Sequence, residues 1–156
     1  MEDIKKQAAD ELYALICDTV KERAFEYYQK PDEKSVELVV NVDERTIRPI
    51  IYVDPKNELI RFYHYLNCGF GVRKFLDAAV ASSTVTAKIQ YGSFDFDYSG
   101  NTVIFRLEIP YKESQISRET INLMLDYTIT AINSYEQDFI DLSHSKIDLD
   151  KFLEKY

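Results

Sequence analysis

Hydrophobic residues recur along this chain with two different periods, which predict where helices and strands form. Apolar residues return every three or four positions, as in amphipathic helices, over residues 2 to about 29, from about 72 onward, from 117 for about 25 residues, and over 147–153. They alternate with polar residues, as in half-buried strands, over 36–42, 47–53, 60–66, 94–98 and 103–109. Residues 83–90 begin with a β-branched run that fits either a helix or a strand.

Turn residues predict that the first three strands form an antiparallel meander. Asp43–Arg45 makes one turn, and the loop Asp54–Asn57 makes the next. A four-residue loop at the second position sets Ile51 opposite Ile60 and keeps the apolar residues of both strands on one face. Pro49 cannot donate a backbone hydrogen bond, so we expect a sheet edge or an irregularity near that residue.

The last two strands are predicted to form a second hairpin. A two-residue loop at Gly100-Asn101 sets Phe96 opposite Phe105 on the apolar face. The same register sets Asp95 opposite Arg106 on the polar face. One register therefore gives a sensible pairing on both faces.

The order of helix, three strands, helix, two strands and helix predicts an α+β fold with an antiparallel sheet packed against helices. Ser117 is expected to cap the long helix. With 156 residues, 46% hydrophobic content, and only four Gly and four Pro, the chain is expected to form a single domain over residues 1–156. Residues 143–156 are expected to be a C-terminal extension of that domain.

The charge balance excludes several kinds of partner. The 27 acidic and 19 basic residues give a net charge of -8, which disfavours binding to nucleic acid or to an anionic membrane. No stretch has the length of a membrane span or the pattern of a signal peptide, so a cytoplasmic location is expected. Cys17 and Cys68 could form a disulfide, but their surroundings do not indicate one.

The candidate catalytic residues all have simpler interpretations. His64 falls on an inward-facing strand position, which favours a satisfied core histidine, and His144 in a Ser-His-Ser interruption is expected to be solvated. Asp95 and Asp97 could hold a cation or a substrate, but an exposed ion pair with Arg106 is favoured. Since no catalytic motif occurs, we expect a non-enzymatic protein with no cofactor and no metal ion.

The outward face of the meander carries more aromatic residues than a solvated sheet face normally does. Tyrosine and arginine together are typical of protein-binding hot spots. The alternative is that a helix or the terminal segment of the same chain covers this face. The apolar and aromatic residues are Val39, Ile50, Tyr52, Leu59, Tyr63 and Tyr65, and Arg48 and Arg61 flank them.

The segments 92–106, Ile109-Pro110 and 117–121 resemble the bacterial sensory-transduction-regulator family, also called YbjN. The order of elements also resembles the fold of type III secretion chaperones. This resemblance implies a cytoplasmic bacterial protein, dimeric, that acts by contacting other proteins. It implies no catalytic residue, because the family is not defined by any.

Three functional hypotheses follow. The first is a chaperone-like or regulatory interaction module that holds a partner protein on the aromatic sheet face, through Arg48, Tyr52, Arg61, Tyr63 and Tyr65, or on a strand edge. The second is a ligand-binding protein or enzyme with a pocket between sheet and helices, anchored by Arg48, Arg61 or His64. The third makes the aromatic face a homodimer interface only.

Overall fold

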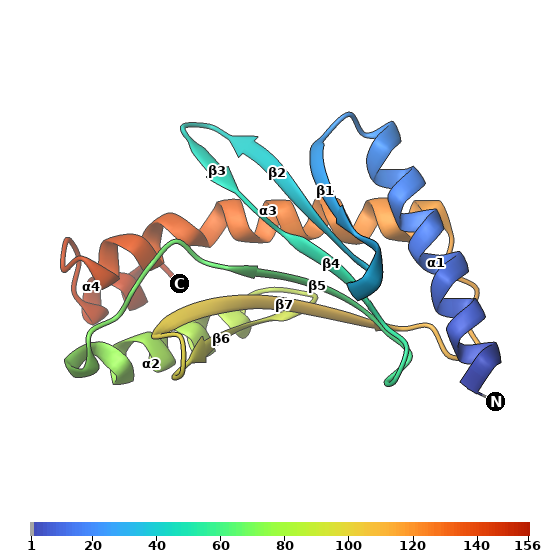
Figure 1. Cartoon of the computed structure of the whole chain (residues 1–156). Coiled ribbons are helices and arrows are strands. Elements are labelled where there is room, and N and C mark those ends of the chain that lie inside the picture. Colours follow the sequence, from blue (N-terminus) through green and yellow to red (C-terminus); the bar gives the residue numbers. More distant parts are fainter. Residues whose placement is uncertain (1) are drawn as a thin grey trace. The chain divides into compact units, whose positions relative to one another are not determined.

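The computed structural model describes residues 2–156, which form four α-helices, two short 3-10 helices and seven strands (Figure 1). The helices are α1 (Glu2–Glu22), α2 (Phe75–Thr86), α3 (Arg118–Ser143) and α4 (Leu149–Glu154), with the 3-10 turns η1 (Pro31–Glu33) and η2 (Val72–Lys74). The strands are β1 (Glu26–Lys30), β2 (Ser35–Val42), β3 (Arg45–Ile47), β4 (Ile50–Asp54), β5 (Leu59–Tyr65), β6 (Ser93–Asp97) and β7 (Thr102–Pro110).

The strands form one antiparallel sheet in the order β1-β2-β4-β5-β7-β6, with β3 paired to β2. This confirms the predicted α+β class with an antiparallel sheet and helices. The order of elements differs from the prediction in two ways: an additional strand, β1, precedes the predicted meander, and the strand expected over 47–53 is divided into β3 and β4.

The chain divides into two compact units. The first unit contains the residues up to Tyr63 together with Glu108–Ile129, and the second contains His64–Leu107 together with Thr130–Tyr156. Strands β5 and β7 and helix α3 each contribute residues to both units. The expectation that residues 1–156 behave as a single domain stays a prediction.

The core of the first unit forms where the apolar stripe of α1 and the start of α3 meet the inward side chains of β2, β4 and β5. Alternation along the strands places these side chains on one face. The buried residues are Ala9, Leu12, Ile16 and Val20 of α1, Val36, Leu38, Ile51, Val53, Ile60 and Phe62 of the strands, and Ile121 and Leu125 of α3.

The first helix ends seven residues earlier than the sequence predicted, because α1 stops at Glu22 instead of continuing to about residue 29. Ala24 adopts a left-handed conformation with φ 55°, which a helix cannot contain. Arg23 donates hydrogen bonds to Asn122 (3.1 Å) and Asp126 (2.6 Å) on α3. The chain then reverses into β1, whose Tyr27 pairs with Leu38 of β2.

Both predicted hairpin registers are wrong by two residues. In β4–β5, Ile51 pairs with Phe62 rather than with Ile60, and in β6–β7, Phe94 pairs with Phe105. In the first hairpin, Asp54 still pairs with Leu59, so the loop comprises residues 55–58, with Glu58 at φ 54°. In the second hairpin, the loop comprises residues 98–101 instead of two residues. A shift of two residues keeps every side chain on its face.

The irregularity expected near Pro49 is confirmed. The chain leaves the sheet between β3 and β4, at Arg48 and Pro49. The Pro49 carbonyl still accepts a 2.9 Å hydrogen bond from the Leu38 backbone nitrogen. Proline therefore sits at a break between two short strands, where its missing donor removes no ladder bond.

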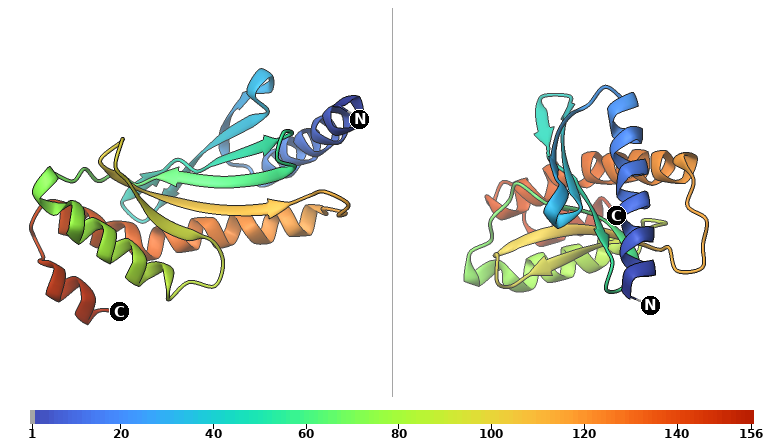
Figure 2. Two further views of the ribbon diagram at one scale, coloured as in Figure 1. Left: turned by 90° about the horizontal axis from the view of Figure 1, so that it is seen from below. Right: turned by 45° about the vertical axis from the view of Figure 1, so that its right-hand side comes forward.

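The second unit has a core of clustered aromatic rings beneath α2 and the end of α3. Figure 2 shows α2, in green, running beside the β6–β7 hairpin. The Phe94 ring lies 5.1 Å from Phe105 and 5.7 Å from Phe139, centroid to centroid. Residues 83–86, which fitted either helix or strand, form the last turn of α2.

The cap expected at Ser117 is present, and the structure adds a second cap, at Asp148, that the sequence analysis did not predict. The Ser117 hydroxyl accepts a hydrogen bond from the Thr120 backbone nitrogen at 3.2 Å and so caps α3. Asp148 caps α4 in the same way, through the Lys151 nitrogen at 2.9 Å. The segment 143–156 contains the predicted short terminal helix, whose Phe152 is buried.

Candidate protein-binding face

The outward side chains of β2, β4 and β5 in the first unit form one surface, which we call the tyrosine face. It brings together most of the predicted site residues, because neighbouring strands pair Tyr52 with Arg61 and Ile50 with Tyr63. Arg48 lies beside it, in the break between β3 and β4. The tyrosine face consists of Val39, Ile50, Tyr52, Leu59, Arg61 and Tyr63, with Arg48 at its border.

The tyrosine face is accessible to solvent. Tyr52, Tyr63 and Arg61 are half-buried and Arg48 is exposed. Tyr65 continues the same alternation along β5 but belongs to the second unit, where it is 50% exposed. The tyrosines are therefore not sealed beneath the chain, which was the alternative considered from the sequence.

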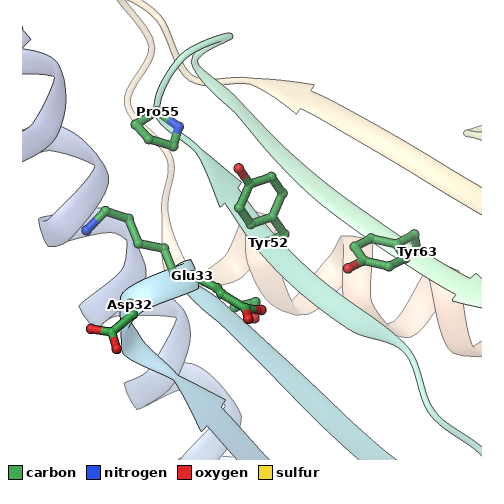
Figure 3. A pocket seen from close by; sticks show the side chains of 7 residues that line it. Asp32, Glu33, Tyr52, Pro55 and Tyr63 are labelled. Carbon is green, nitrogen blue, oxygen red and sulfur yellow. The ribbon is translucent and has the colours of Figure 1, made fainter.

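A pocket of about 340 Å³ opens beside Tyr52 and Tyr63 (Figure 3). Its other walls come from the turn η1 and from the start of the β4–β5 loop. The picture shows the Tyr52 and Tyr63 rings next to each other along one side, with Pro55 to the upper left and η1 below; the Asp32 carboxylate is directed away from the rings. The lining residues are Asp32, Glu33, Lys34, Ser35, Tyr52, Pro55 and Tyr63.

Both arginines of the face form ion pairs. Arg61 Nη2 lies 3.0 Å from Asp54 Oδ2, and Arg61 Nε lies 3.3 Å from Glu108 Oε1. Arg48 Nη1 donates to Glu37 at 3.1 Å. Two carboxylates hold the Arg61 guanidinium beside the tyrosines, whereas the 56% exposed Arg48 has a single surface ion pair, which balances its charge but holds it weakly.

Asp54 organises the edge of the face through four contacts. Besides pairing with Arg61, it accepts hydrogen bonds from the backbone nitrogens of Lys56 and Asn57 at 3.1 Å and from Asn57 Nδ2 at 2.8 Å. Burial alone would raise the pKa of Asp54, but the Asn57 hydrogen bonds and the charge of Arg61 outweigh it and lower the pKa. The carboxylate is therefore ionised when the loop is formed.

A second pocket, of about 280 Å³, lies in the first unit between α1 and the loop after β7. Its walls carry Leu12, Leu15, Tyr111 and Ile116 among others, and neither this pocket nor the one beside the tyrosines includes Arg48, Arg61 or His64. The anchors proposed for a ligand site are therefore not brought together in either pocket.

His64 is a satisfied core histidine, as predicted. Its side chain is 3% exposed, and Nε2 lies 3.1 Å from Glu136 Oε1, which also accepts from the Asn67 backbone nitrogen at 3.0 Å. Glu136 is fully buried on α3, and sequence reasoning missed it because acidic residues are normally assigned to the surface. The one signal in the sequence for a buried acidic partner was the inward-facing His64, whose ring nitrogens need hydrogen-bond partners.

The other candidates are also accounted for. Asp95 pairs with Arg106 at 3.0 Å, and Asp97 accepts hydrogen bonds from Ser99 in the adjoining loop. Both cysteines are free thiols. Residues 2–156 contain no group of three or more His, Cys, Asp or Glu side chains placed to hold a metal ion. Of the helices in the same residues, none has the length and apolar character needed to cross a bilayer.

The chain has an α+β fold like that of type III secretion chaperones. The structure of the HopA1–SchA chaperone–effector complex matches with a TM-score of 0.61 and 10% identity, covering 84% of this chain and 97% of that chain. No protein-family model and no curated protein matches the sequence.

Two further solved structures match the same fold. The ExsC–ExsE complex matches with a TM-score of 0.56 and 12% identity, covering 83% of this chain and 94% of that chain. YbjN from E. coli matches with a TM-score of 0.56 and 8% identity, covering 83% and 89%. The resemblance to both groups is thus confirmed at the level of the fold.

Proposed function

We propose that this chain is a non-enzymatic protein-interaction module, chaperone-like or regulatory, which holds a segment of a partner protein on the tyrosine face. The observation that carries the proposal is the accessible pair Tyr52 and Tyr63 beside two arginines that form ion pairs. Rings and guanidinium groups held in place lose little conformational freedom on binding, so more of the contact energy is realised as affinity. Two of the matched structures, which share this fold, are complexes of two proteins.

The experiment compares the parent protein with the double variant Tyr52→Ser/Tyr63→Ser. Chains that co-purify with the parent are identified, expressed and purified, and their affinity for each variant is measured by calorimetry. Since truncating a hot-spot residue costs at least about 2 kcal/mol, or roughly 30-fold in affinity, we expect at least that loss.

A matched control is Tyr91→Ser, which removes an exposed tyrosine of the second unit that lies outside both proposed surfaces. It should leave the affinity of the purified partner unchanged. Tyr65→Ser, tested separately, shows whether the contact extends along β5. Equal affinities for the parent and the Tyr52→Ser/Tyr63→Ser protein would contradict the proposed site.

We also propose that the chain forms a homodimer, through an exposed apolar patch on the second unit. Val72, Leu76 and Tyr98 are 79%, 73% and 64% exposed, which is unusual for large apolar side chains gathered at one helix start and one hairpin loop. The ring of Phe75 connects them, since its centroid lies 5.8 Å from that of Tyr98.

Light scattering tests the dimer and separates it from the binding face. Leu76→Glu places a charge in the apolar patch and should give monomers. Tyr63→Ser should leave the dimer intact. If Tyr63→Ser gives monomers and Leu76→Glu does not, the tyrosine face is a homodimer interface.

A further inference from the structure

The pocket beside the tyrosine face has an aromatic wall and an acidic wall. Tyr52 and Tyr63 form the first, and Asp32 and Glu33 of η1 form the second (Figure 3). The faces of aromatic rings attract cations, and carboxylates do so at short range. A volume of about 340 Å³ is at the lower end of ligand pockets and accommodates one side chain.

The ion pairs around the pocket do not neutralise the negative charge of its acidic wall. Lys34, the one basic residue in the lining, has its ammonium group bound by Asp10 of α1. Glu33 lies 3.8 Å from Lys30, with both side chains more than half exposed, so this pair is weak. Asp32 forms no ion pair with any part of the chain that the structure describes.

Polar groups in the pocket also lack partners. Ser35 is 6% exposed, and its hydroxyl makes no hydrogen bond within residues 2–156 although it lines the pocket. The Tyr52 hydroxyl likewise has no partner within those residues. Neither oxygen is among the fully buried side-chain atoms that lack a partner within those residues, so both are open to the pocket and can accept a hydrogen bond from a bound donor.

We propose that this pocket receives a cationic side chain, a lysine ammonium or an arginine guanidinium, from the partner segment bound to the tyrosine face. The ring faces, the two carboxylates and the free hydroxyl oxygens all favour a positively charged donor. Because Tyr52 and Tyr63 belong to both the face and the pocket, one bound segment contacts both. The inference rests on the proposed function and specifies the chemistry of the partner.

The net charge of the whole chain agrees with this choice of occupant. A protein with a net charge of -8 attracts basic segments at long range and repels acidic ones. The arginines on the face do not reverse this locally, because Arg61 is paired with two carboxylates and Arg48 with one.

The test uses the purified full chain and a display library of random twelve-residue peptides. Peptides are kept for analysis only if Tyr52→Ser/Tyr63→Ser weakens their binding by about tenfold or more. In the tightest such peptide, each lysine or arginine is replaced by glutamine, and dissociation constants are measured by calorimetry. The same peptides are measured against Asp32→Asn/Glu33→Gln.

We expect the kept peptides to share one basic position, and replacing it to weaken binding by about tenfold. The Asp32→Asn/Glu33→Gln protein should bind the original peptide about tenfold more weakly as well. Replacing the basic residue of the peptide should then have little further effect on binding to this variant, because a direct contact gives non-additive effects in a double-mutant cycle. Raising salt from about 50 to 300 mM should weaken parent binding more than variant binding.

The control Asp43→Asn/Glu44→Gln removes the same charges from the β2–β3 turn of the same unit and should leave affinity unchanged. Circular dichroism verifies that each variant is folded. Four results would each overturn the inference while leaving the tyrosine face as the binding site. The kept peptides could lack a shared basic position, or the effects in the cycle could be additive. The control could lose as much affinity as Asp32→Asn/Glu33→Gln, or free arginine could bind as tightly as the peptide. If no peptide depends on Tyr52 and Tyr63, the proposed function fails as well.

Discussion

Replacing Asp54 with asparagine tests how the edge of the tyrosine face is held. The substitution keeps the shape and one acceptor oxygen for the loop nitrogens, but removes the charge that Arg61 and Asn57 Nδ2 contact at 3.0 and 2.8 Å. A hydrogen bond to a charged group contributes about 1.5–3 kcal/mol. Since Arg61 keeps Glu108 as a partner, we expect a loss of about 1.5–3 kcal/mol in the free energy of unfolding at pH 7.

The dependence on pH makes the test specific. The pKa of Asp54 is lowered in the folded protein, so the carboxylate stabilises the fold above its ordinary pKa, and this stabilisation is lost as the pH falls through the lowered value. The parent protein should therefore lose its advantage over Asp54→Asn in acid. Urea denaturation followed by far-UV circular dichroism, at pH 7 and near pH 2.5, measures the difference; the chain has no tryptophan to report it by fluorescence.

Asp95→Asn is the matched control, because Asp95 also pairs with an arginine but is exposed. Its effect should stay below about 1 kcal/mol. The reasoning is refuted if Asp54→Asn is as stable as the parent at pH 7. It is also refuted if the two proteins differ by the same amount at both pH values.

Further predictions concern the cores and the titrating groups. Phe94→Ala should lower the free energy of unfolding by about 3–5 kcal/mol, because a buried ring among three others is removed; a thermal melt within a degree of the parent would contradict this. Ser117→Ala should cost about 1 kcal/mol and Ser117→Asp much less, measured in urea. Burial, together with the hydrogen bond to Cys17, raises the pKa of Tyr13 to about 12. The protonated Tyr13 should therefore stabilise the fold fully below the ordinary pKa of tyrosine, and this stabilisation should be lost as the pH rises through about 12. An NMR titration of the parent, with Tyr13→Phe to assign the Tyr13 signal, measures this pKa. Burial raises the pKa of Cys68, so its thiol should react far more slowly with a disulfide reagent in the folded chain than in urea, and equal rates would contradict the burial.

The periodicity of the sequence was sufficient to predict faces but not partners. Ile51 and Phe62 lie on the core face as predicted, yet they pair with each other rather than two residues away. A shift of two residues preserves the alternation of side chains, so the hydrophobic pattern cannot distinguish the two registers. The loop conformation decides, and it depends on Asp54 and Glu58.

The failure to predict strand β1 has a different physical cause. The segment Glu26–Lys30 has one inward residue, Tyr27, and its other side chains are mostly exposed, so it shows little contrast between apolar and polar positions. It continued the helical pattern of α1 closely enough to be assigned to the helix. Its strand conformation comes from pairing with β2, which is a non-local interaction.

The candidate site was predictable only in part, because alternation along the strands predicts faces but not the turns beside them. Alternation along β4 and β5 placed Tyr52 and Tyr63 on one face, and the structure brings them together. The acidic wall was not predictable, because Asp32 and Glu33 lie in a turn that follows the missed strand. Their position beside the tyrosines depends on how β1 and β2 pair.

The central claim is that the tyrosine face binds a segment of another protein. Calorimetry of a purified partner against the parent, Tyr52→Ser/Tyr63→Ser and Tyr91→Ser proteins tests it most directly. The account predicts a loss of at least about 30-fold for the double variant and none for Tyr91→Ser. Unchanged affinity for the double variant, with the variant folded, would contradict it.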